Sequence, residues 1–463
     1  MSNKNEILVS DFFKNDLPNY ACYDNTRKIA SGVDGMKNSM RKLIFTLMKK
    51  YPNEFVKSEN LANIAAAFTN YLHGAQNLTG VINTLSQSFV GANNYPFTTG
   101  NSGGFGTRIN PTCAAARYTR VSLSKIMKTM LDPRDDAIIG QQYFEGDYIE
   151  PKFFMPTFPL IFLNGSLGAI SSGFSQNIYP RNPNEISDYI KKKLAGVENP
   201  RMALLPWFRG FKGVVRYNSE TQSNEVVGCI ERNNTTNYTI TELPIGVEYQ
   251  KYVEFLDKLI DNGTIVDYED KCDPKTDNIL FEVKTTRAFT KQYEDLESLN
   301  RVFHLVKTLP ENLNCIDETG RIHEYSSVRE ILDSFIALRL SFYDKRKTHL
   351  LKTLKNDLEI LVSKYLFCKG VIEKTIVVAN KKKEEIVAQL EKIEKIVKQD
   401  GSYDYLLRMP IHSLSSEKMA ELHEQIKQKK DEFVKIKGTE IKDMWIEDLK
   451  SVEKALKEYD KNQ

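Results

Sequence analysis

The last third of the chain carries the sequence feature that most constrains its fold. A helical pattern begins near Ser327 and Glu330, which have the spacing of a capping box, and it runs without proline or glycine to Cys368. Gly370 is placed to end this helix. Some 40 residues at about 1.5 Å each predict a helix on the order of 60 Å long.

A second apolar pattern predicts the partner of this helix. Apolar residues repeat at heptad spacing in two stretches, 351–365 and 445–459. Two heptad seams indicate two long helices packed side by side. Residues 370–414 lie between the seams, and their proline and amphipathic pattern predict a small globular tip. We therefore expect residues 326–463 to form an antiparallel coiled coil with a small helical tip at about 370–414.

The first 150 residues predict a module of short helices and glycine-rich loops. Apolar residues recur at helical spacing over 36–48, and a second helix is expected over 61–72. A glycine-rich loop over 98–106 follows these helices. Small helices with basic loops are typical of a helix-turn-helix or winged-helix module. Residues 1–150 are therefore expected to be a winged-helix domain.

The middle of the chain predicts a mixed domain over 151–325. Prolines surround the apolar run 160–163, where we expect strands and turns. The other elements expected here are β-rich pieces over 214–227 and 238–243, and helices over 184–194 and 248–260. The predicted fold class is therefore multidomain α+β, with a winged-helix domain, an α/β domain and a long coiled coil.

Positive charge is concentrated near the N-terminus. Residues 1–130 contain 15 Lys and Arg against 7 Asp and Glu, although the whole chain has a net charge of only +3. Residues 101–130 contain five basic residues and no acid. Such a distribution favours a polyanionic partner such as nucleic acid, and the alternative is a solvated basic face.

The cysteine and apolar patterns exclude several protein classes. The six cysteines are spread along the chain without a Cys-x-x-Cys pair, so neither a zinc site nor a disulfide framework is expected. No apolar run reaches eighteen residues, and the N-terminus has no apolar signal-peptide core. We expect a cytoplasmic protein, in a host cell if the source is viral, with no membrane partner.

Two patterns that suggest bound metal or nucleotide are incomplete. Glu145-Gly146-Asp147 resembles the acidic start of a metal-binding fold, but no Asp-x-Asp follows it, so a surface turn is expected. The glycines of 100–106 lack the Gly-Lys-Ser/Thr of a phosphate-binding loop. The sequence therefore predicts neither a metal site nor an ATP site in this chain.

One segment indicates a specific chemistry. Phe105-Gly106-Thr107-Arg108 precedes an Arg117-Tyr118 pair by about ten residues. This arrangement resembles the breakage-reunion part of type IIA DNA topoisomerases, in which a similar loop leads to a tyrosine that attacks DNA. Further stretches resemble motifs of that family in the same order, at residues 34–42, 71–75, 89–94, 163–174, 240–244 and 343–347. The resemblance covers nearly the whole chain.

The sequence departs from the family pattern at four positions near the expected site. Asn38, Met40, Leu72 and Ala75 stand where the family has Pro, Gln, His and Glu. These changes reduce the number of polar groups around the site. They leave the tyrosine and its neighbouring arginine in place, so the details of DNA contact are affected more than the reaction.

The resemblance implies a set of site residues. The catalytic residues would be Tyr118 as nucleophile with Arg117, Arg41 and His73, and the DNA-binding residues would be Lys37, Lys42, Arg108, Arg120 and Ile170. The alternative role for Arg117, Arg41 and Lys37 is that of phosphate clamps, which only position the DNA. The alternative for His73 is that it is a core histidine. The family has an isoleucine that wedges between base pairs, and Ile170 or a neighbour would fill that role, because one extra residue precedes Gly173.

The chemistry of a phenol explains why cations are expected around the nucleophile. An ordinary phenol ionises with a pKa near 10, so a tyrosine needs help at neutral pH. Arg117, with Arg41 and His73 brought in by folding, would favour ionisation and donate hydrogen bonds to the scissile phosphate. Attack by tyrosine exchanges one phosphodiester for another, so rejoining the strand requires no ATP.

The resemblance also implies partners. The family's ATPase and acidic metal-binding domains are not found in this sequence, a layout similar to the medium subunit of T-even-type phage topoisomerase. We therefore expect Mg²⁺ to be held, and ATP to be bound, by a partner subunit. Double-stranded DNA would be the substrate of a homodimer joined through a C-gate in the coiled-coil tip and through the winged-helix region, and the middle domain would be the family's tower.

Two other interpretations of the sequence remain open. A non-catalytic winged-helix coiled-coil protein that bends DNA fits the composition and the helical periodicity. A nuclease or a tyrosine recombinase is the other rival, although the first needs its own metal site and the second a broader Arg/His set. The Arg117-Tyr118 pair discriminates against the DNA-bending protein, because such a protein needs no nucleophile.

Overall fold

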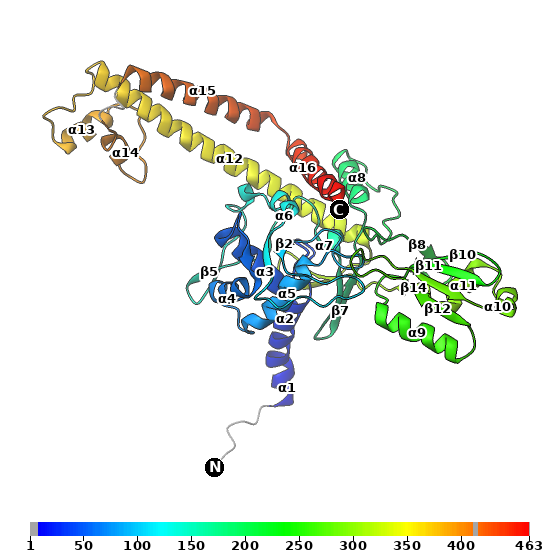
Figure 1. Ribbon diagram of the computed structural model, residues 1–463. Helices are drawn as coiled ribbons and strands as arrows, with labels where there is room; N and C mark the ends of the chain where they lie inside the picture. Colours follow the sequence, from blue (N-terminus) through cyan, green and yellow to red (C-terminus); the bar gives the residue numbers. More distant parts are fainter. Residues whose placement is uncertain (1–7, 411–414, 463) are drawn as a thin grey trace, which may run out of the picture. The chain divides into compact units, whose positions relative to one another are not determined.

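The computed structural model describes residues 8–410 and 415–462, which form two compact units. One unit contains the chain up to Arg339 and from Asp448 onward, and the other is Leu340–Glu447. The architecture is the predicted multidomain α+β class (Figure 1). The finer division of the chain at residues 150 and 325 stays a prediction. No helix in the described residues is both long enough and apolar enough to cross a membrane.

The N-terminal part of the first unit has winged-helix topology, as predicted. Its elements are α3 (Asn38–Lys50), β1 (Val56–Lys57), α4 (Ser58–Phe68), α5 (Ala75–Ser86), β2 (Thr98–Ser102) and β3 (Arg120–Leu123). The strands form an antiparallel sheet in the order β1-β3-β2. Buried Leu43, Leu61 and Leu78 provide one core residue from each helix. The helix expected over 61–72 begins and ends earlier, at Ser58 and Phe68.

Other helices and strands flank this module. A helical arm precedes it and comprises α1 (Val9–Asp11), a π-helical turn (Phe12–Asp16) and α2 (Leu17–Lys28). The elements that follow it are α6 (Lys125–Met130), a 3-10 turn (Pro133–Asp135), β4 (Gln142–Phe144) and β5 (Asp147–Ile149). Strands β4 and β5 form a hairpin whose two turn residues, Glu145 and Gly146, have φ of 51° and 90°. The Glu-Gly-Asp pattern is thus the surface turn that the sequence predicts.

A buried ion pair fixes the loop that leads into α3. Asp34 is fully buried and accepts hydrogen bonds from Arg41 Nε at 2.7 Å and Nη2 at 3.0 Å. Its oxygens also accept from the backbone N–H groups of Met36 and Phe154, each at 3.0 Å. Gly35 has φ of +64°, and a Cβ there would lie 2.4 Å from the backbone nitrogen of Ile161. Only glycine therefore fits this close approach of two backbone segments.

Replacing Asp34 by Asn tests how much the fold depends on this pair. The variant keeps the side-chain shape but leaves the buried Arg41 guanidinium without its paired carboxylate. We expect the free energy of unfolding to fall by about 3–5 kcal/mol, measured by urea denaturation. Asp16→Asn, at an exposed position of the arm, is the matched control and should change stability little. Equal stability of the two variants would contradict the structural role of the pair.

The middle of the chain contains the predicted mixture of strands and helices. Its first elements are α7 (Ile161–Asn164), β6 (Ser166–Ser171), β7 (Phe174–Ile178) and α8 (Pro183–Leu194). The run 160–163 was expected to include strand, but it forms the buried helical turn α7, which ends at Gly165 with φ of +74°. The expectation was wrong because a short apolar run fits a buried helix as well as a strand.

Two further sheets follow in this region. The sheet of order β14-β9-β8 comprises β8 (Val214–Asn218), β9 (Ser223–Val227) and β14 (Val306–Leu309). The sheet of order β10-β11-β13-β12 comprises β10 (Cys229–Arg232), β11 (Asn237–Glu242), β12 (Asp267–Asp270) and β13 (Phe281–Lys284). The remaining elements are α9 (Tyr249–Asp261), α10 (Arg287–Gln292), α11 (Leu296–Val302), β15 (Asn314–Ile316) and β16 (Ile322–Glu324). An aromatic core including Tyr238, Tyr252 and Phe281 joins the second sheet to α9.

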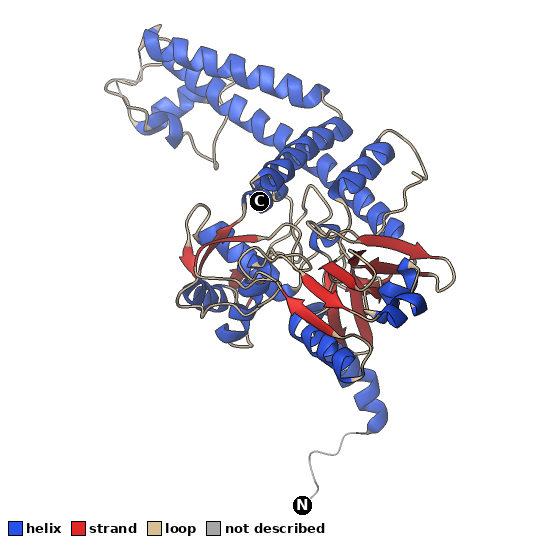
Figure 2. Ribbon diagram, turned by 45° about the vertical axis from the view of Figure 1, so that its right-hand side comes forward, coloured by secondary structure: helices blue, strands red, loops and turns tan. Residues whose placement is uncertain are grey.

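The C-terminal part contains the predicted long helices and small tip. Its helices are α12 (Val328–Ile372), α13 (Lys383–Leu390), α14 (Asp404–Leu407), α15 (Ser416–Gly438) and α16 (Ile441–Lys461). The second unit is helical throughout its described regular structure, as Figure 2 shows. A cluster that includes Phe367, Leu390 and Leu406 forms the core of the tip. Residues 411–414 of the predicted tip lie outside the described residues.

Two details of the coiled coil differ from expectation. Helix α12 continues through Gly370 and ends at Ile372. A Cβ at position 370 would lie 2.6 Å from Ile376 Cδ1, so this glycine makes room for packing rather than ending the helix. The returning helix is broken at Thr439, which has an extended backbone with ψ of 130° and separates α15 from α16.

Candidate active site

Tyr118 lies on a turn directly before β3 and is 63% exposed. Its neighbour Thr119 is buried and donates a hydrogen bond from Oγ1 to Ser58 Oγ at 2.7 Å. The Thr119 carbonyl also accepts from the Ser58 backbone N–H at 3.0 Å. The start of α4 therefore fixes the backbone beside Tyr118 while the phenol remains open to solvent.

Two exposed arginines lie in the same segment as Tyr118. The Arg117 guanidinium lies 5.0 Å from the centre of the Tyr118 ring, within the range of a cation–π interaction. Arg120 begins β3 and donates to the Phe55 carbonyl at 3.2 Å. The structure thus places Tyr118, Arg117 and Arg120 on one exposed basic segment. Cations on an exposed surface attract a phosphate.

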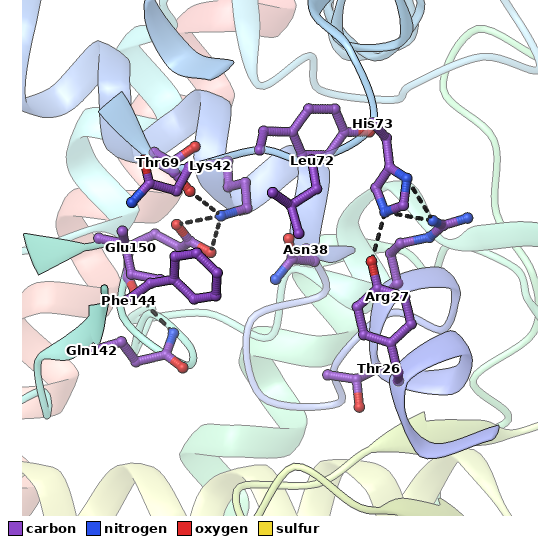
Figure 3. Close-up of a pocket in the computed structure, with 14 residues that line it drawn as sticks. Thr26, Arg27, Asn38, Lys42, Thr69, Leu72, His73, Gln142, Phe144 and Glu150 are labelled. Atoms are coloured by element: carbon purple, nitrogen blue, oxygen red, sulfur yellow. Dashed lines mark hydrogen bonds and ion pairs between the residues drawn. The ribbon is translucent and has the colours of Figure 1, made fainter. Parts of the chain in front are cut away.

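The loop between α4 and α5 carries His73, which contacts the end of α2. The Tyr23 hydroxyl lies 2.6 Å from His73 Nε2, and Arg27 Nη1 lies 3.1 Å from Nδ1 and 2.6 Å from Nε2. Figure 3 shows the Arg27 and His73 side chains pointing toward each other, with their contact drawn as a dashed line. Burial, followed by the positive charge of Arg27, lowers the pKa of His73. A neutral imidazole is therefore favoured at neutral pH.

A cavity of about 410 Å³ joins several predicted site residues. Lys37, His73 and Ile170 all line it, together with Arg27 and Lys28. Burial lowers the pKa of Lys37, which immediately precedes α3. Tyr118 and Arg117 do not line this cavity. The chain therefore presents a basic cluster around His73 and a separately positioned tyrosine.

Ile170 lies on the hairpin of β6 and β7 and is 75% exposed. Ser166 pairs with Ile178 and Ala169 with Gln176, so β6 has one residue more than β7 over this interval. This bulge, at Leu167 and Gly168, accommodates an extra residue upstream of Gly173. Ile170 remains in register beyond it and is the most exposed large apolar residue of the hairpin.

Three predicted site residues instead form ion pairs with carboxylates inside the protein. Arg41 is buried against Asp34, and although burial acts to lower its pKa, the carboxylate of Asp34 raises it. Lys42 Nζ lies 2.8 Å from Glu150 Oε1 and 2.6 Å from the Thr69 carbonyl. Arg108 pairs with Glu242 and donates to the Leu243 carbonyl at 2.7 Å. A role at DNA for Arg41, Lys42 and Arg108 stays a prediction.

Sequence reasoning missed Tyr23 and Arg27. They come from the end of α2, and none of the family-like motifs includes them. Their spacing of four residues places both on one face of a helix, which is the signal that could have indicated a shared role. Lys42 and Glu150 line a neighbouring cavity of about 200 Å³ that also contains Tyr23, Arg27 and His73.

The described residues offer neither a metal site nor a disulfide. Within residues 8–410 and 415–462, no group of three or more His, Cys, Asp or Glu side chains could hold a metal ion. All six cysteines are free thiols.

Replacing Arg27 by Ala tests the electrostatics of the His73 cluster. Loss of the nearby positive charge should raise the pKa of His73 toward the ordinary value of about 6.5. The pKa is measured by NMR titration of the imidazole signals. Lys14→Ala, which removes a cation from the exposed π-helical turn, is the control and should leave the titration unchanged. A titration of His73 that is unaffected by Arg27→Ala would contradict the described contact.

Comparisons with known proteins complete the description of the site. The sequence pattern of the family described as the A-type subunit of DNA gyrase/topoisomerase IV matches residues 27–450. The chain is 32% identical over 471 residues to mitochondrial DNA topoisomerase 2 of Dictyostelium discoideum, covering 98% of this chain and 36% of that protein. It is 30% identical over 468 residues to DNA topoisomerase 2 of invertebrate iridescent virus 6, covering 98% and 40%.

A solved structure is similar over nearly the whole chain. The crystal structure of the Plasmodium falciparum topoisomerase II DNA-binding, cleavage and re-ligation domain matches with a TM-score of 0.87 and 31% identity. The match covers 98% of this chain and 65% of that one. The chain spans little more than a third of the length of the first curated relatives it matches, with 36% and 35% covered.

Proposed function

The chain belongs to the family of DNA gyrase/topoisomerase IV A-type subunits, and from this premise we propose that it is the DNA-cleaving and rejoining subunit of a type II DNA topoisomerase. The observation that carries the proposal is the exposed Tyr118 beside Arg117, on a turn anchored to a winged helix. An exposed phenol among cations is what attack on a DNA phosphate requires.

The proposed reaction is a reversible exchange of phosphate esters. The phenolic oxygen of Tyr118 attacks a backbone phosphorus, loses its proton, and displaces the deoxyribose 3′ oxygen, which takes up a proton. One phosphorus–oxygen bond forms while one breaks, so the 5′ phosphate remains esterified to the protein. Attack by the 3′ hydroxyl reverses these steps and releases Tyr118. No ATP is consumed in rejoining, because the ester is retained throughout.

The cationic groups have separate parts in this proposal. Arg117 lies against the nucleophile and is suited to bind the phosphate as its oxygens gain charge. Lys37, Arg27 and neutral His73 form a second set of donors around one cavity, suited to the adjacent backbone phosphates. Arg41 contributes indirectly. Its guanidinium donates to Asp34 and to the Met36 carbonyl, and these hydrogen bonds fix the loop that carries Lys37.

We propose that the active enzyme is a two-fold dimer with DNA bound across it. One tyrosine per chain can cut one strand, and passage of a duplex requires both strands to be cut. Tyr118 does not line the cavity around His73 in this chain. In the proposed dimer, the exposed Tyr118 of one protomer meets DNA held by the basic cluster of the other. The tip of the coiled coil would form the second contact between protomers.

We also propose that Mg²⁺ and ATP enter the reaction through a partner subunit. This follows from the family resemblance, in which an ATPase and an acidic metal-binding domain serve the same cleavage site. The described residues contain no cluster that fits a metal ion, so no step of the reaction is assigned to one.

The six free thiols fit a reducing compartment such as the cytoplasm.

Replacing Tyr118 by Phe tests the nucleophile. The chain is mixed with its ATPase and metal-binding partner, Mg²⁺ and supercoiled plasmid, and the reaction is quenched with detergent. The natural chain should give relaxed plasmid and protein covalently joined to DNA ends, and Tyr118→Phe should give neither, because the attacking oxygen is gone. Tyr143→Phe is the matched control, since Tyr143 is 64% exposed.

The outcome of this experiment also separates the rival functions. Adduct that persists in Tyr118→Phe would show that another residue is the nucleophile. Nicked or linear DNA with free ends and no attached protein would identify a nuclease. Binding and bending of DNA without any cutting would favour a non-catalytic, architectural DNA-binding protein.

Replacing Ile170 by Ala tests the proposed wedge. Removal of this exposed side chain should reduce DNA bending, because a smaller group cannot hold two base pairs apart. Bending is measured by fluorescence energy transfer between dyes at the two ends of a duplex. Binding affinity should change less than bending, since backbone contacts remain. Leu167→Ala on the same strand is the control, and bending that is unchanged by Ile170→Ala would remove Ile170 from the proposal.

A further inference from the structure

We propose that Asp24 is a positioning residue that fixes the tip of the β6–β7 hairpin, so that Ile170 can bend DNA against a rigid support. This inference rests on the proposed function, because it assigns Asp24 a part in DNA bending. It adds a residue that no motif of the sequence indicates.

The Asp24 carboxylate holds the hairpin turn through Ser172 and is itself held by Lys28 of α2. Its Oδ2 accepts a hydrogen bond from the Ser172 backbone N–H at 3.0 Å and another from Ser172 Oγ at 3.0 Å. Its Oδ1 lies 2.9 Å from Lys28 Nζ, and the Asp24 side chain is only 6% exposed. The hydrogen bond from Lys28 is the main cause that lowers the pKa of Asp24, followed by opposing burial and the Ser172 contact. The group is therefore a carboxylate at neutral pH.

The neighbouring residue extends the same contact. Asn25 is buried, and its Oδ1 accepts a hydrogen bond from Ser171 Oγ at 2.6 Å. Ser171 directly follows Ile170 on β6, and Ser172 is the first residue of the turn. Two consecutive residues of α2 thus hold two consecutive residues beside the wedge. Hydrogen bonds to a buried carboxylate are stronger than neutral ones, so Asp24 is the principal restraint.

The base of the hairpin is held independently of Asp24. Gln176 on β7 is buried, accepts from the Ala30 backbone N–H at 2.9 Å and donates to the Ala30 carbonyl at 3.1 Å. Its Nε2 also donates to the Asn314 carbonyl at 2.7 Å. Loss of Asp24 should therefore loosen the tip of the hairpin and leave its base in place.

A rigid tip matters because bending a duplex requires work. Unstacking a base step costs a few kcal/mol, and an isolated two-stranded hairpin is only marginally stable in water. A tip that yields would move aside and leave the DNA straight. The C-terminal end of α2 also carries Tyr23 and Arg27, which contact His73. The same end of α2 therefore contacts both the hairpin that carries the wedge and the basic cluster.

The experiment compares Asp24→Ala with the natural chain in two assays. In the first, energy transfer across a dye-labelled duplex reports bending by the chain, and binding is measured by titration of the same duplex. Asp24→Ala should bend DNA about as little as Ile170→Ala, while its dissociation constant changes less than about threefold. Asp11→Ala, in the exposed part of the helical arm, is the matched control and should bend DNA normally.

The second assay tests whether reduced DNA bending accounts for slower adduct formation by Asp24→Ala. Covalent adduct is measured in the presence of Mg²⁺ with the ATPase and metal-binding partner, on a fully paired duplex and on one made flexible by unpaired bases near its centre. Asp24→Ala should form adduct about tenfold more slowly on the paired duplex and at nearly the natural rate on the flexible one, because the flexible duplex costs little to bend. Asp24→Asn keeps the side-chain shape, so its rate of adduct formation on the paired duplex should fall less. The flexible duplex should restore that rate as it does for Asp24→Ala.

Two results would overturn the proposal. One is normal bending by Asp24→Ala, and the other is a loss of adduct that the flexible duplex does not rescue. Failure of the proposed function would look different, because the natural chain would then form no adduct on either duplex. The bending comparison would still report on Asp24 in that case.

Discussion

The buried ion pair between Asp34 and Arg41 is the interaction on which the rest of the proposed cleavage module depends. A single carboxylate accepts from the guanidinium and from the backbone N–H groups of Met36 and Phe154. It therefore joins the start of the winged helix to the segment that leads into α7. Because both partners are buried and joined by two hydrogen bonds, neither charge can be removed without leaving the other buried without its partner. The basic cluster around Lys37 is built on this fixed loop.

The end of α2 connects two parts of the proposed machinery. Tyr23 and Arg27 reach His73, and Asp24 with Asn25 reaches the hairpin that carries Ile170. A helical turn presents residues in different directions at fixed spacing, so one short segment can hold both without flexible intermediates. The proposed phosphate-binding cluster and the proposed wedge are thereby held by one end of a single helix.

Periodic patterns allowed most of the fold to be predicted. The strands near residues 214–227 and the helix α9 follow alternation and helical spacing that can be read locally. The run that became α7 could not be assigned, because its helical turn is selected by burial and by Gly165 rather than by its own residues. Gly370 was misjudged for a similar reason, since close packing by Ile376 decides its role.

The candidate site was less predictable than the fold, because sequence gives the number of charges but not their partners. Arg41, Lys42 and Arg108 add to the basic excess of the first 130 residues, yet each faces a buried carboxylate. Arg117 and Arg120 belong to the same excess and remain exposed. The affinity for DNA falls as the salt concentration rises, and the slope of log affinity against log salt is about 0.9 for each phosphate that a protein cation neutralises. In the proposed complex with DNA, the exposed arginines and the lysine-lined cavity would therefore contribute most to the salt dependence, and this contribution would be smaller than the sequence charge suggests.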